Sequence, residues 1–254
     1  MTTVFLIPAR SGSTRIKNKN LRKINNKSIL VNKIENCIRT NIGNVFVSTD
    51  SIKIANISKK NGAKILGIRP KKLSTSNSSM LSVVIHFLIE YKKKFHKIPS
   101  FLILAPPTNP FLNFKSIKKA LNILKMKKQF NSIVSIYRSN EQPFQLIDVN
   151  NKKARFGIFN YGKKNYFSFE RSQDVPKFYK FSSALQITKA KYFVKYLKIK
   201  SNFQKVRPFD TKKCLGYVIN SFETTDINTM SDYNIIKKLI NKKKILKMIM
   251  LNYL

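Results

Sequence analysis

The sequence predicts an α/β fold in which helices cover both faces of a mostly parallel sheet. Short apolar runs rich in Val, Ile, Leu and Phe alternate along the chain with segments whose apolar residues recur at helical spacing. Such alternation indicates parallel strands, because each parallel crossover needs a connection of about a dozen residues. The chain has 254 residues, 43% of them hydrophobic, which is enough for one sizeable core. We therefore expect a single domain over residues 1–254.

The first half of the chain is predicted to form three strand–helix units. The first strand covers residues 4–7 and ends near Ala9, because Pro8 cannot donate a hydrogen bond to a sheet ladder. Asp50 follows the second strand and is interpreted as the N-cap of the helix that begins at Ser51, with a metal ligand as the alternative. The predicted elements after the first strand are a helix over 28–40, a strand over 44–50, a helix over 51–61, a strand over 63–68 and a helix over 80–94.

In the second half the alternation stops and then resumes. A strand from Phe101, a helix over 116–127 and a strand over 132–137 extend the sheet. Over residues 139–181 we expect an inserted subdomain, in which 144–149 and 154–159 could pair as a hairpin and aromatic residues are frequent. The elements predicted beyond it are a strand over 184–188, a helix over 189–197, a strand over 215–219 and a long terminal helix.

The loop after the first strand has the composition of a phosphate-binding site. It leaves the carboxyl end of that strand, where ligands of open α/β sheets bind, and Gly12 allows close backbone approach. Neither the Walker pattern nor the three-glycine dinucleotide fingerprint is present. The loop suits a triphosphate, and the alternative is an ordinary basic surface turn. Its cationic and hydroxyl donors are Arg10, Ser11, Ser13, Arg15, Lys17 and Lys19.

The charge and the cysteines limit the other classes of function. The net charge of +39 would ordinarily indicate a nucleic-acid partner, but the lysines are spread along the whole chain and mixed with Asn and Ile. We attribute the charge to codon bias and expect no specific nucleic-acid partner. No apolar stretch approaches the ~20 residues of a membrane span, so we expect a cytoplasmic protein. Cys37 and Cys214 lack zinc-site spacing and are expected to be buried.

Residues 9–20 resemble the nucleotide loop of the acylneuraminate cytidylyltransferases, which reads Ala-Arg-x-Gly-Ser-Lys-Arg-Ile-x-x-Lys-Asn. Thr14 stands where that family has a lysine. Four further segments resemble family motifs in the same order along the chain. They are Arg69-Pro70 with Leu73, Pro107-Thr108 with Pro110, Arg171 with Gln173-Asp174 and Pro176, and Asp226-Ile227-Asn228-Thr229.

The resemblance implies a Rossmann-like three-layer nucleotidyltransferase fold and a reaction of CTP with an acidic nonulosonic sugar to give the CMP-sugar and pyrophosphate. It also implies Mg2+ as cofactor and a homodimer formed through residues 139–181, which reach toward the partner's active site. Arg10, Lys19 and Asp226 are the expected catalytic residues. The expected ligands are Arg10, Ser13, Arg15 and Lys19 for the phosphates, Asn20, Arg69 and Ser79 for the nucleoside, Thr108, Arg171 and Gln173 for the sugar, and Asp226 and Asn228 for the metal.

Several positions depart from the family pattern. Pro106 occupies a glutamine position, Ser182-Ser183 replaces Asn-Gly, and Asn228 replaces the second carboxylate of the metal motif. Two alternatives therefore stay open. One is a catalytically weakened relative that binds nucleotide or nucleic acid, and the other is an enzyme for another sugar acid such as deoxy-octulosonic acid.

Overall fold

A six-stranded sheet forms the centre of the computed structural model, with strand order β10-β6-β9-β5-β1-β4. The structure describes residues 1–141, 143, 148–150, 153–155, 160, 162–164, 166–169, 171, 173–199, 203–204 and 206–241. The strands of the sheet are β1 Thr3–Pro8, β4 Asn44–Ser48, β5 Phe101–Leu104, β6 Ser132–Arg138, β9 Tyr179–Lys189 and β10 Cys214–Val218.

The sheet is mostly parallel, as the sequence predicts. β1 pairs in parallel with β4 and β5, and β10 pairs in parallel with β6. β9 is the exception, because it runs antiparallel to both of its neighbours, β5 and β6. The sequence predicted β9 only over 184–188, but the strand has 11 residues, since its first part pairs with the outer end of β6.

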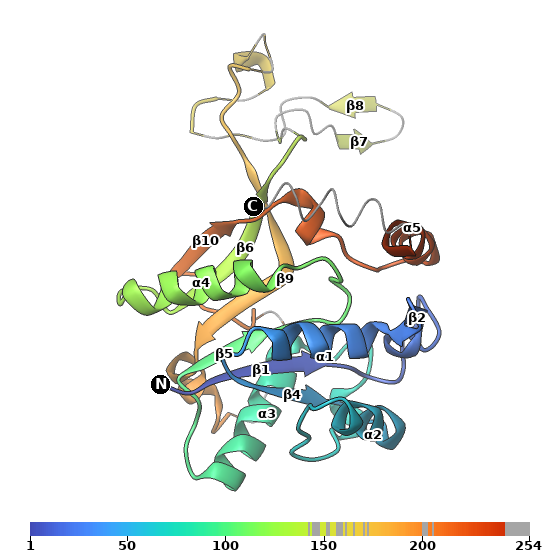
Figure 1. Ribbon diagram of the computed structural model, residues 1–254. Coiled ribbons are helices and arrows are strands. Elements are labelled where there is room, and N and C mark those ends of the chain that lie inside the picture. Colours follow the sequence, from blue (N-terminus) through green and yellow to red (C-terminus); the bar gives the residue numbers. More distant parts are fainter. Residues whose placement is uncertain are drawn as a thin grey trace.

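Helices cover both faces of the sheet (Figure 1). Alternate residues of β1 pack into different cores, with Phe5 on one face and Leu6 on the other. The first core also contains side chains of α1 Ile29–Arg39, α2 Ile52–Lys60 and α4 Phe114–Met126. The second contains side chains of α3 Met80–Phe95 and of the 3-10 helix Ala190–Tyr196, where the sequence predicted a helix over 189–197.

The segment over 63–68 was predicted as a strand and is not one. Lys64 makes a single parallel bridge to Phe46, through hydrogen bonds with Val45 and Val47 of β4. Ile65 and Leu66 then pack against opposite cores, so the apolar alternation is explained by packing without a ladder. The segment lies beside β4 at the edge of the sheet, where the bridge of Lys64 to β4 is enough to hold it without a full strand.

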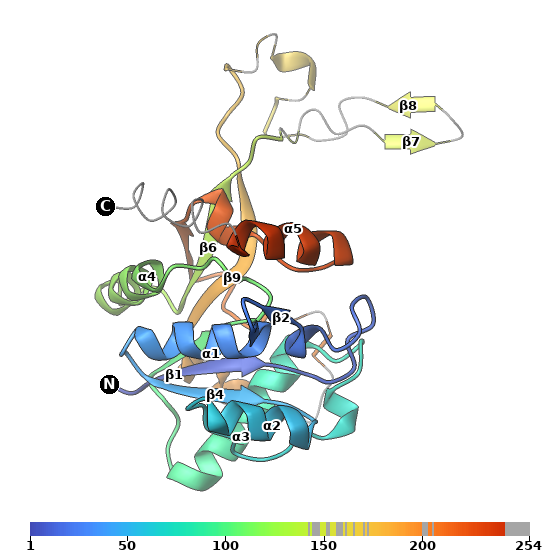
Figure 2. The same cartoon turned by 45° about the vertical axis from the view of Figure 1, so that its right-hand side comes forward.

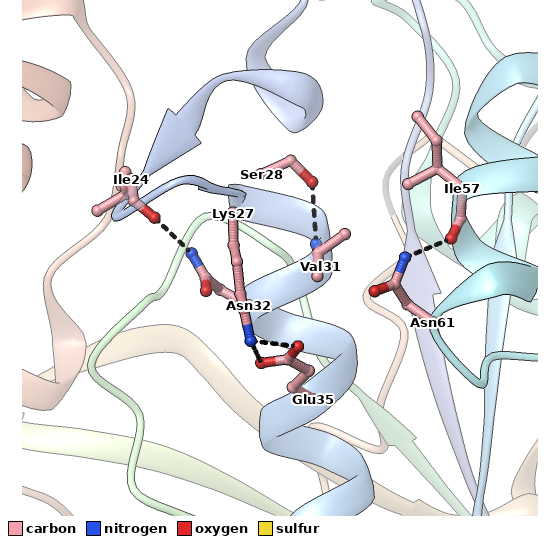
Figure 3. Close-up of polar contacts among 8 residues, drawn as sticks. All are labelled: Ile24, Lys27, Ser28, Val31, Asn32, Glu35, Ile57 and Asn61. Carbon is pink, nitrogen blue, oxygen red and sulfur yellow. Dashed lines mark hydrogen bonds and ion pairs between the residues drawn. The ribbon is translucent and has the colours of Figure 1, made fainter.

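A short hairpin that the sequence did not predict fixes the start of α1. β2 Lys23–Ile24 pairs with β3 Lys27–Ser28, and the Ser28 hydroxyl caps the helix by accepting from Val31 N at 3.2 Å. Lys27 Nζ contacts both carboxylate oxygens of Glu35 at 2.7 and 2.8 Å (Figure 3). A third apolar cluster joins this hairpin to α5 Met230–Asn241, whose Tyr233 hydroxyl donates to Lys23 O at 2.7 Å.

The predicted insertion falls between β6 and β9, which leave the sheet side by side (Figure 2). Tyr179–Phe181 still pair with β6, so the last residues of the predicted insertion belong to a sheet strand. β7 Asp148–Asn150 and β8 Lys153–Arg155 form an antiparallel pair, within the region where the sequence predicted that 144–149 and 154–159 could pair. The outer parts of the predicted hairpin, 144–147 and 156–159, lie outside the described residues.

Candidate active site

A cavity of about 370 Å³ lies at the carboxyl ends of β1 and β5. It gathers residues from four separate segments, which are the opening loop, the segment 69–83, the loop after β5 and the loop before α5. Eight of the predicted site residues line it: Arg10, Ser13, Arg15, Lys19, Asn20, Arg69, Thr108 and Asn228. A parallel sheet brings such segments together because its loops emerge at one edge.

Asp50 holds the opening loop from outside this cavity. Its Oδ1 accepts from Ser11 N at 2.8 Å and its Oδ2 accepts from Ser11 Oγ at 2.6 Å. The prediction that Asp50 caps α2 is therefore wrong. The cap is Ser51, whose Oγ accepts from Ile54 N at 3.3 Å, since it lies one position nearer the helix. Partial burial alone would raise the pKa of Asp50, but the bonds from Ser11 and the charge of Arg69 hold this pKa below its ordinary value.

Two residues at the end of the opening loop are fixed by side-chain hydrogen bonds. Asn20 is buried and donates from Nδ2 to Arg10 O at 2.9 Å, so it braces the loop that carries the cations. Lys19 Nζ donates to Ile227 O at 2.9 Å and so connects the loop to the segment before α5. Partial burial lowers the pKa of Lys19, and the nearby carboxylate of Asp226 opposes this shift.

Arg69 is almost wholly buried beside the opening loop. Its backbone N–H donates to Thr49 O at 2.7 Å, and its Nε donates to Ser74 Oγ at 3.0 Å. Arg10 donates to the backbone oxygen of the same Ser74 at 3.5 Å, so both arginines are hydrogen-bonded to one residue. Burial lowers the pKa of Arg69, and Asp50 opposes the shift. Ser79, predicted to hold the nucleoside, does not line the cavity, and its side chain caps α3 by accepting from Ser82 N at 3.1 Å.

The loop after β5 is tied to the segment before α5. Thr108 O accepts from Ile227 N at 3.0 Å, and Asn109 Nδ2 donates to the backbone oxygens of Thr224 and Thr225 at 3.4 and 3.3 Å. Beneath this junction, Lys33 Nζ donates to Asn109 O at 2.6 Å. Lys33 is a buried lysine on α1, and sequence reasoning missed it because one more lysine in a lysine-rich chain gives no signal.

Of the two predicted metal ligands only Asn228 lines the cavity, and Asp226 is hydrogen-bonded behind it. Asn228 lines the cavity and donates from Nδ2 to Asp226 Oδ2 at 3.1 Å. Asp226 Oδ1 is buried, and the described part of the chain offers it no hydrogen-bond partner. Such an oxygen is free to coordinate a cation. Among the described residues, no three His, Cys, Asp or Glu side chains form a metal cluster.

The backbone of this segment is fixed by a capping box at the start of α5. Asp232 Oδ2 accepts from the backbone N–H groups of Asn228 and Thr229 at 2.9 and 2.8 Å, and Asp232 N donates to Thr229 Oγ1 at 3.2 Å. These bonds, the Thr229 amide first, lower the pKa of Asp232 although burial opposes them. Asp232 thereby sets where Asn228 lies, which the sequence could have revealed through the Thr-x-x-Asp spacing.

Arg171 and Gln173 are exposed and do not line the cavity within one chain. A larger cavity of about 700 Å³ lies elsewhere, between one side of α1, the start of α4 and Ile240. None of the predicted site residues lines that cavity, and its charged residues include Lys27 and Glu35, which pair with each other. We therefore place the candidate site in the smaller, cation-lined cavity.

Comparisons with known proteins identify the family of the chain. The family model described as Cytidylyltransferase matches residues 4–245. The chain is 27% identical over 241 residues to N-acylneuraminate cytidylyltransferase of Escherichia coli, covering 94% of this chain and 52% of that protein. It is 27% identical over 244 residues to CMP-N,N'-diacetyllegionaminic acid synthase of Legionella pneumophila, covering 94% of this chain and 97% of that protein.

A third relative is the Helicobacter pylori protein named pseudaminic acid cytidylyltransferase and UDP-2,4-diacetamido-2,4,6-trideoxy-beta-L-altropyranose hydrolase. It is 26% identical over 228 residues, and the match spans 89% of this chain and 40% of that protein. The chain thus spans about half or less of the Escherichia coli and Helicobacter pylori proteins.

Among solved structures, a CMP:2-keto-3-deoxy-manno-octonic acid synthetase complexed with CTP matches with a TM-score of 0.69 at 15% identity. The match covers 96% of this chain and all (100%) of that chain, which supports the fold. Within the described residues, no helix is long and apolar enough to cross a membrane.

Proposed function

The chain belongs to the cytidylyltransferase family, whose model matches residues 4–245, and we propose that it transfers CMP from CTP to an acidic nonulosonic sugar. The names of three relatives support this class of substrate, since they are synthases or cytidylyltransferases for N-acylneuraminic, legionaminic and pseudaminic acids. The products are the CMP-sugar and pyrophosphate.

One observation carries the proposal, which is the set of four cations on one cavity at the sheet edge. Arg10, Arg15, Lys19 and Arg69 line a space of about 370 Å³, and no aspartate or glutamate is among its lining residues. A triphosphate brings about four negative charges, and bonds between ionised partners contribute about 1.5–3 kcal/mol each. The excess positive charge of the whole chain adds long-range attraction for such an anion.

The proposed reaction is an in-line displacement at the α-phosphorus. The anomeric hydroxyl of the sugar forms the new phosphorus–oxygen bond as it loses its proton to solvent. The bond to the bridging oxygen breaks, and pyrophosphate leaves with the electron pair. Little covalent work falls to the protein, which binds the phosphates, orients the two substrates and offsets the charge on the leaving group. We assign the phosphates to Arg10, Ser13, Arg15 and Lys19, and the nucleoside to Asn20 and Arg69.

We propose Mg2+ as the cofactor, held by Asp226 and Asn228. The fit rests on the buried Asp226 oxygen that lacks a partner among the described residues, and on the amide oxygen of Asn228 two residues further on. Mg2+ prefers hard oxygen ligands and usually takes only one or two from the protein beside substrate phosphates and water. When bound, it would supply positive charge to the phosphate oxygens. Lys19 would add its own charge there, since its ammonium lies close enough to Asp226 for their charges to interact.

The sugar is assigned to Thr108 and to a second subunit. Thr108 lines the cavity, whereas Arg171 and Gln173 do not. We therefore propose a homodimer in which the 139–181 segment of one subunit brings these two side chains to the site of the other. The resemblance motivates this assignment, together with the exposure of both side chains.

Pyrophosphate release from CTP tests the proposal. The protein should release pyrophosphate only when a sugar acid is supplied, and a panel should contain N-acetylneuraminic, legionaminic, pseudaminic and deoxy-octulosonic acids. Activity with deoxy-octulosonic acid alone would favour the second candidate, which the 30% identity to a Wigglesworthia glossinidia 3-deoxy-manno-octulosonate cytidylyltransferase over 135 residues supports. CTP binding without turnover on any acid would indicate a weakened relative.

A further inference from the structure

The end of β4 contacts both of the loops that carry cations to the cavity. β1 and β4 are parallel neighbours in register, with Pro8 opposite Ser48. Ala9 N donates to Ser48 O at 2.9 Å, just where the opening loop begins. Two residues further along each chain, Ser11 meets Asp50 through the pair of bonds at 2.8 and 2.6 Å. The sheet register therefore brings Asp50 to the loop.

Residues 48–50 also contact the segment that begins with Arg69. Thr49 O, one residue before Asp50, accepts the backbone N–H of Arg69 at 2.7 Å. The carboxylate of Asp50 attracts the buried guanidinium of Arg69. Asp50 is thus the one carboxylate, among the described residues, that is bonded to the opening loop and electrostatically coupled to Arg69.

Neither Ser11 nor Asp50 lines the cavity. Both donors of Ser11 are occupied by Asp50, so they are turned away from a ligand in the cavity. We propose that Asp50 is a positioning residue, which clamps Ser11 so that the opening loop presents Arg10 and Arg15 to the CTP phosphates. This inference rests on the proposed function, because it assigns the loop to CTP.

Charge and geometry make opposite demands on Asp50, and this allows a sharp test. A carboxylate near a bound triphosphate repels it, so by charge alone removal of Asp50 should strengthen CTP binding. If the clamp matters, its removal should weaken CTP binding despite the gain in positive charge. Asparagine separates the two effects, because its amide can still accept from Ser11 N and donate to Ser11 Oγ while it carries no charge.

The experiment compares Asp50→Ala, Asp50→Asn and a control, Glu90→Ala. The control removes one carboxylate from α3, where Glu90 pairs with Lys93 outside the cavity. Calorimetry should show that Asp50→Ala weakens CTP binding about tenfold or more, because the substitution removes the charge-assisted bonds that order the opening loop. Asp50→Asn and Glu90→Ala should bind CTP as the parent does or more tightly. Equal or tighter CTP binding by Asp50→Ala would overturn the proposal.

Hydrogen exchange tests the clamp without any nucleotide. The Ser11 amide should exchange about tenfold faster in Asp50→Ala than in Asp50→Asn or Glu90→Ala, because only alanine leaves that amide without its acceptor. Unchanged exchange would overturn the clamp even if CTP binding fell. If the parent failed to bind CTP, the proposed function would fail, and the exchange rates would still decide whether Asp50 orders the loop. Equal melting temperatures for the two Asp50 variants would exclude a purely structural effect on stability.

Discussion

The Asn228 side chain donates to Asp226 Oδ2 at 3.1 Å, so an amide nitrogen faces the carboxylate where a second carboxylate would repel it. The two side chains are thereby held together without a cation between them. This bond leaves Asp226 Oδ1 as the oxygen without a partner among the described residues, and it leaves the pair with one negative charge. The two side chains are therefore already positioned for a metal ion, but their single negative charge would attract it only weakly.

We predict that Asn228→Asp lowers the Mg2+ concentration needed for half-maximal rate by roughly threefold or more, because the added charge attracts a hard cation. Asp226→Ala should remove most activity, since no carboxylate is left at the motif. Mn2+ binding followed by electron paramagnetic resonance gives a readout that does not depend on turnover. A parent with no turnover at any Mg2+ concentration, beside an active Asn228→Asp variant, would show that the natural chain is a disabled relative.

Lys19→Ala should weaken CTP binding by roughly 10- to 100-fold, which corresponds to the loss of about one charge-assisted hydrogen bond. Lys17→Ala is the matched control, because Lys17 lies in the same loop, is exposed and does not line the cavity. Calorimetric titration with CTP measures both. Unchanged affinity in Lys19→Ala, or an equal loss in both variants, would contradict the assignment of Lys19 to the phosphates.

Light scattering should give a mass of twice 29.5 kDa at micromolar concentration, as expected for a homodimer. If Arg171 completes the partner's site, Arg171→Ala should lose activity with the sugar acid while CTP binding stays as in the parent. Mixing Arg171→Ala with Lys19→Ala subunits should then restore activity, because some mixed dimers contain one intact site. A monomeric mass, or no restoration on mixing, would count against the proposed shared site.

Asp210 should make stability fall in acid. Its carboxylate accepts from Asn131 Nδ2 at 2.8 Å and from the N–H groups of Lys212 and Lys213 at 3.0 and 3.1 Å. Burial would raise the pKa of Asp210, but these three bonds lower it. A carboxyl with a lowered folded pKa binds fewer protons in the folded state than in the unfolded state. Its stabilising contribution is therefore present above the ordinary pKa of about 4 and is lost as the pH falls through the folded value.

The corresponding measurement is the urea midpoint of Asp210→Asn and of the parent at about pH 7 and about pH 3. The variant should be less stable by about 1–3 kcal/mol at neutral pH, and the difference should narrow in acid. Asp174→Asn is the control, because Asp174 is exposed. A difference between parent and Asp210→Asn that stays constant with pH would refute the assignment.

Much of the site could be predicted because its residues follow strand ends. Apolar runs located β1, β4 and β5, and the polar residues that follow them line or brace one cavity. The partners of these residues could not be predicted in the same way. The Asp50–Ser11 bonds depend on the register of β1 against β4, and an aspartate before a helix equally suits an N-cap. Lys33 was missed because its burial depends on how α1 packs beneath the loop after β5.

The antiparallel direction of β9 could not be predicted from the sequence, for a different reason. A buried apolar strand looks the same whichever way it runs, and only the length of the connection limits the choice. The segment 139–181 is long enough to allow either direction. In the structure, β6 leads out of the sheet to the insertion and β9 leads back from it, so the two strands are antiparallel (Figure 2).

The position of β9 has a consequence for how the chain folds. β5 and β6 do not pair with each other, and β9 lies between them, with Ile187 opposite Ile103 on one side and Ile133 on the other. The first three strands of this sheet, β1, β4 and β5, can associate once Leu104 has been synthesised, whereas β6 pairs with none of them and joins the sheet only through residues 179–189. Such long-range pairing is slow, and it leaves the outer edge of β5 open in the meantime. A nascent chain held before residue 179 would therefore expose an unpaired apolar strand, and chaperone binding should peak at that length.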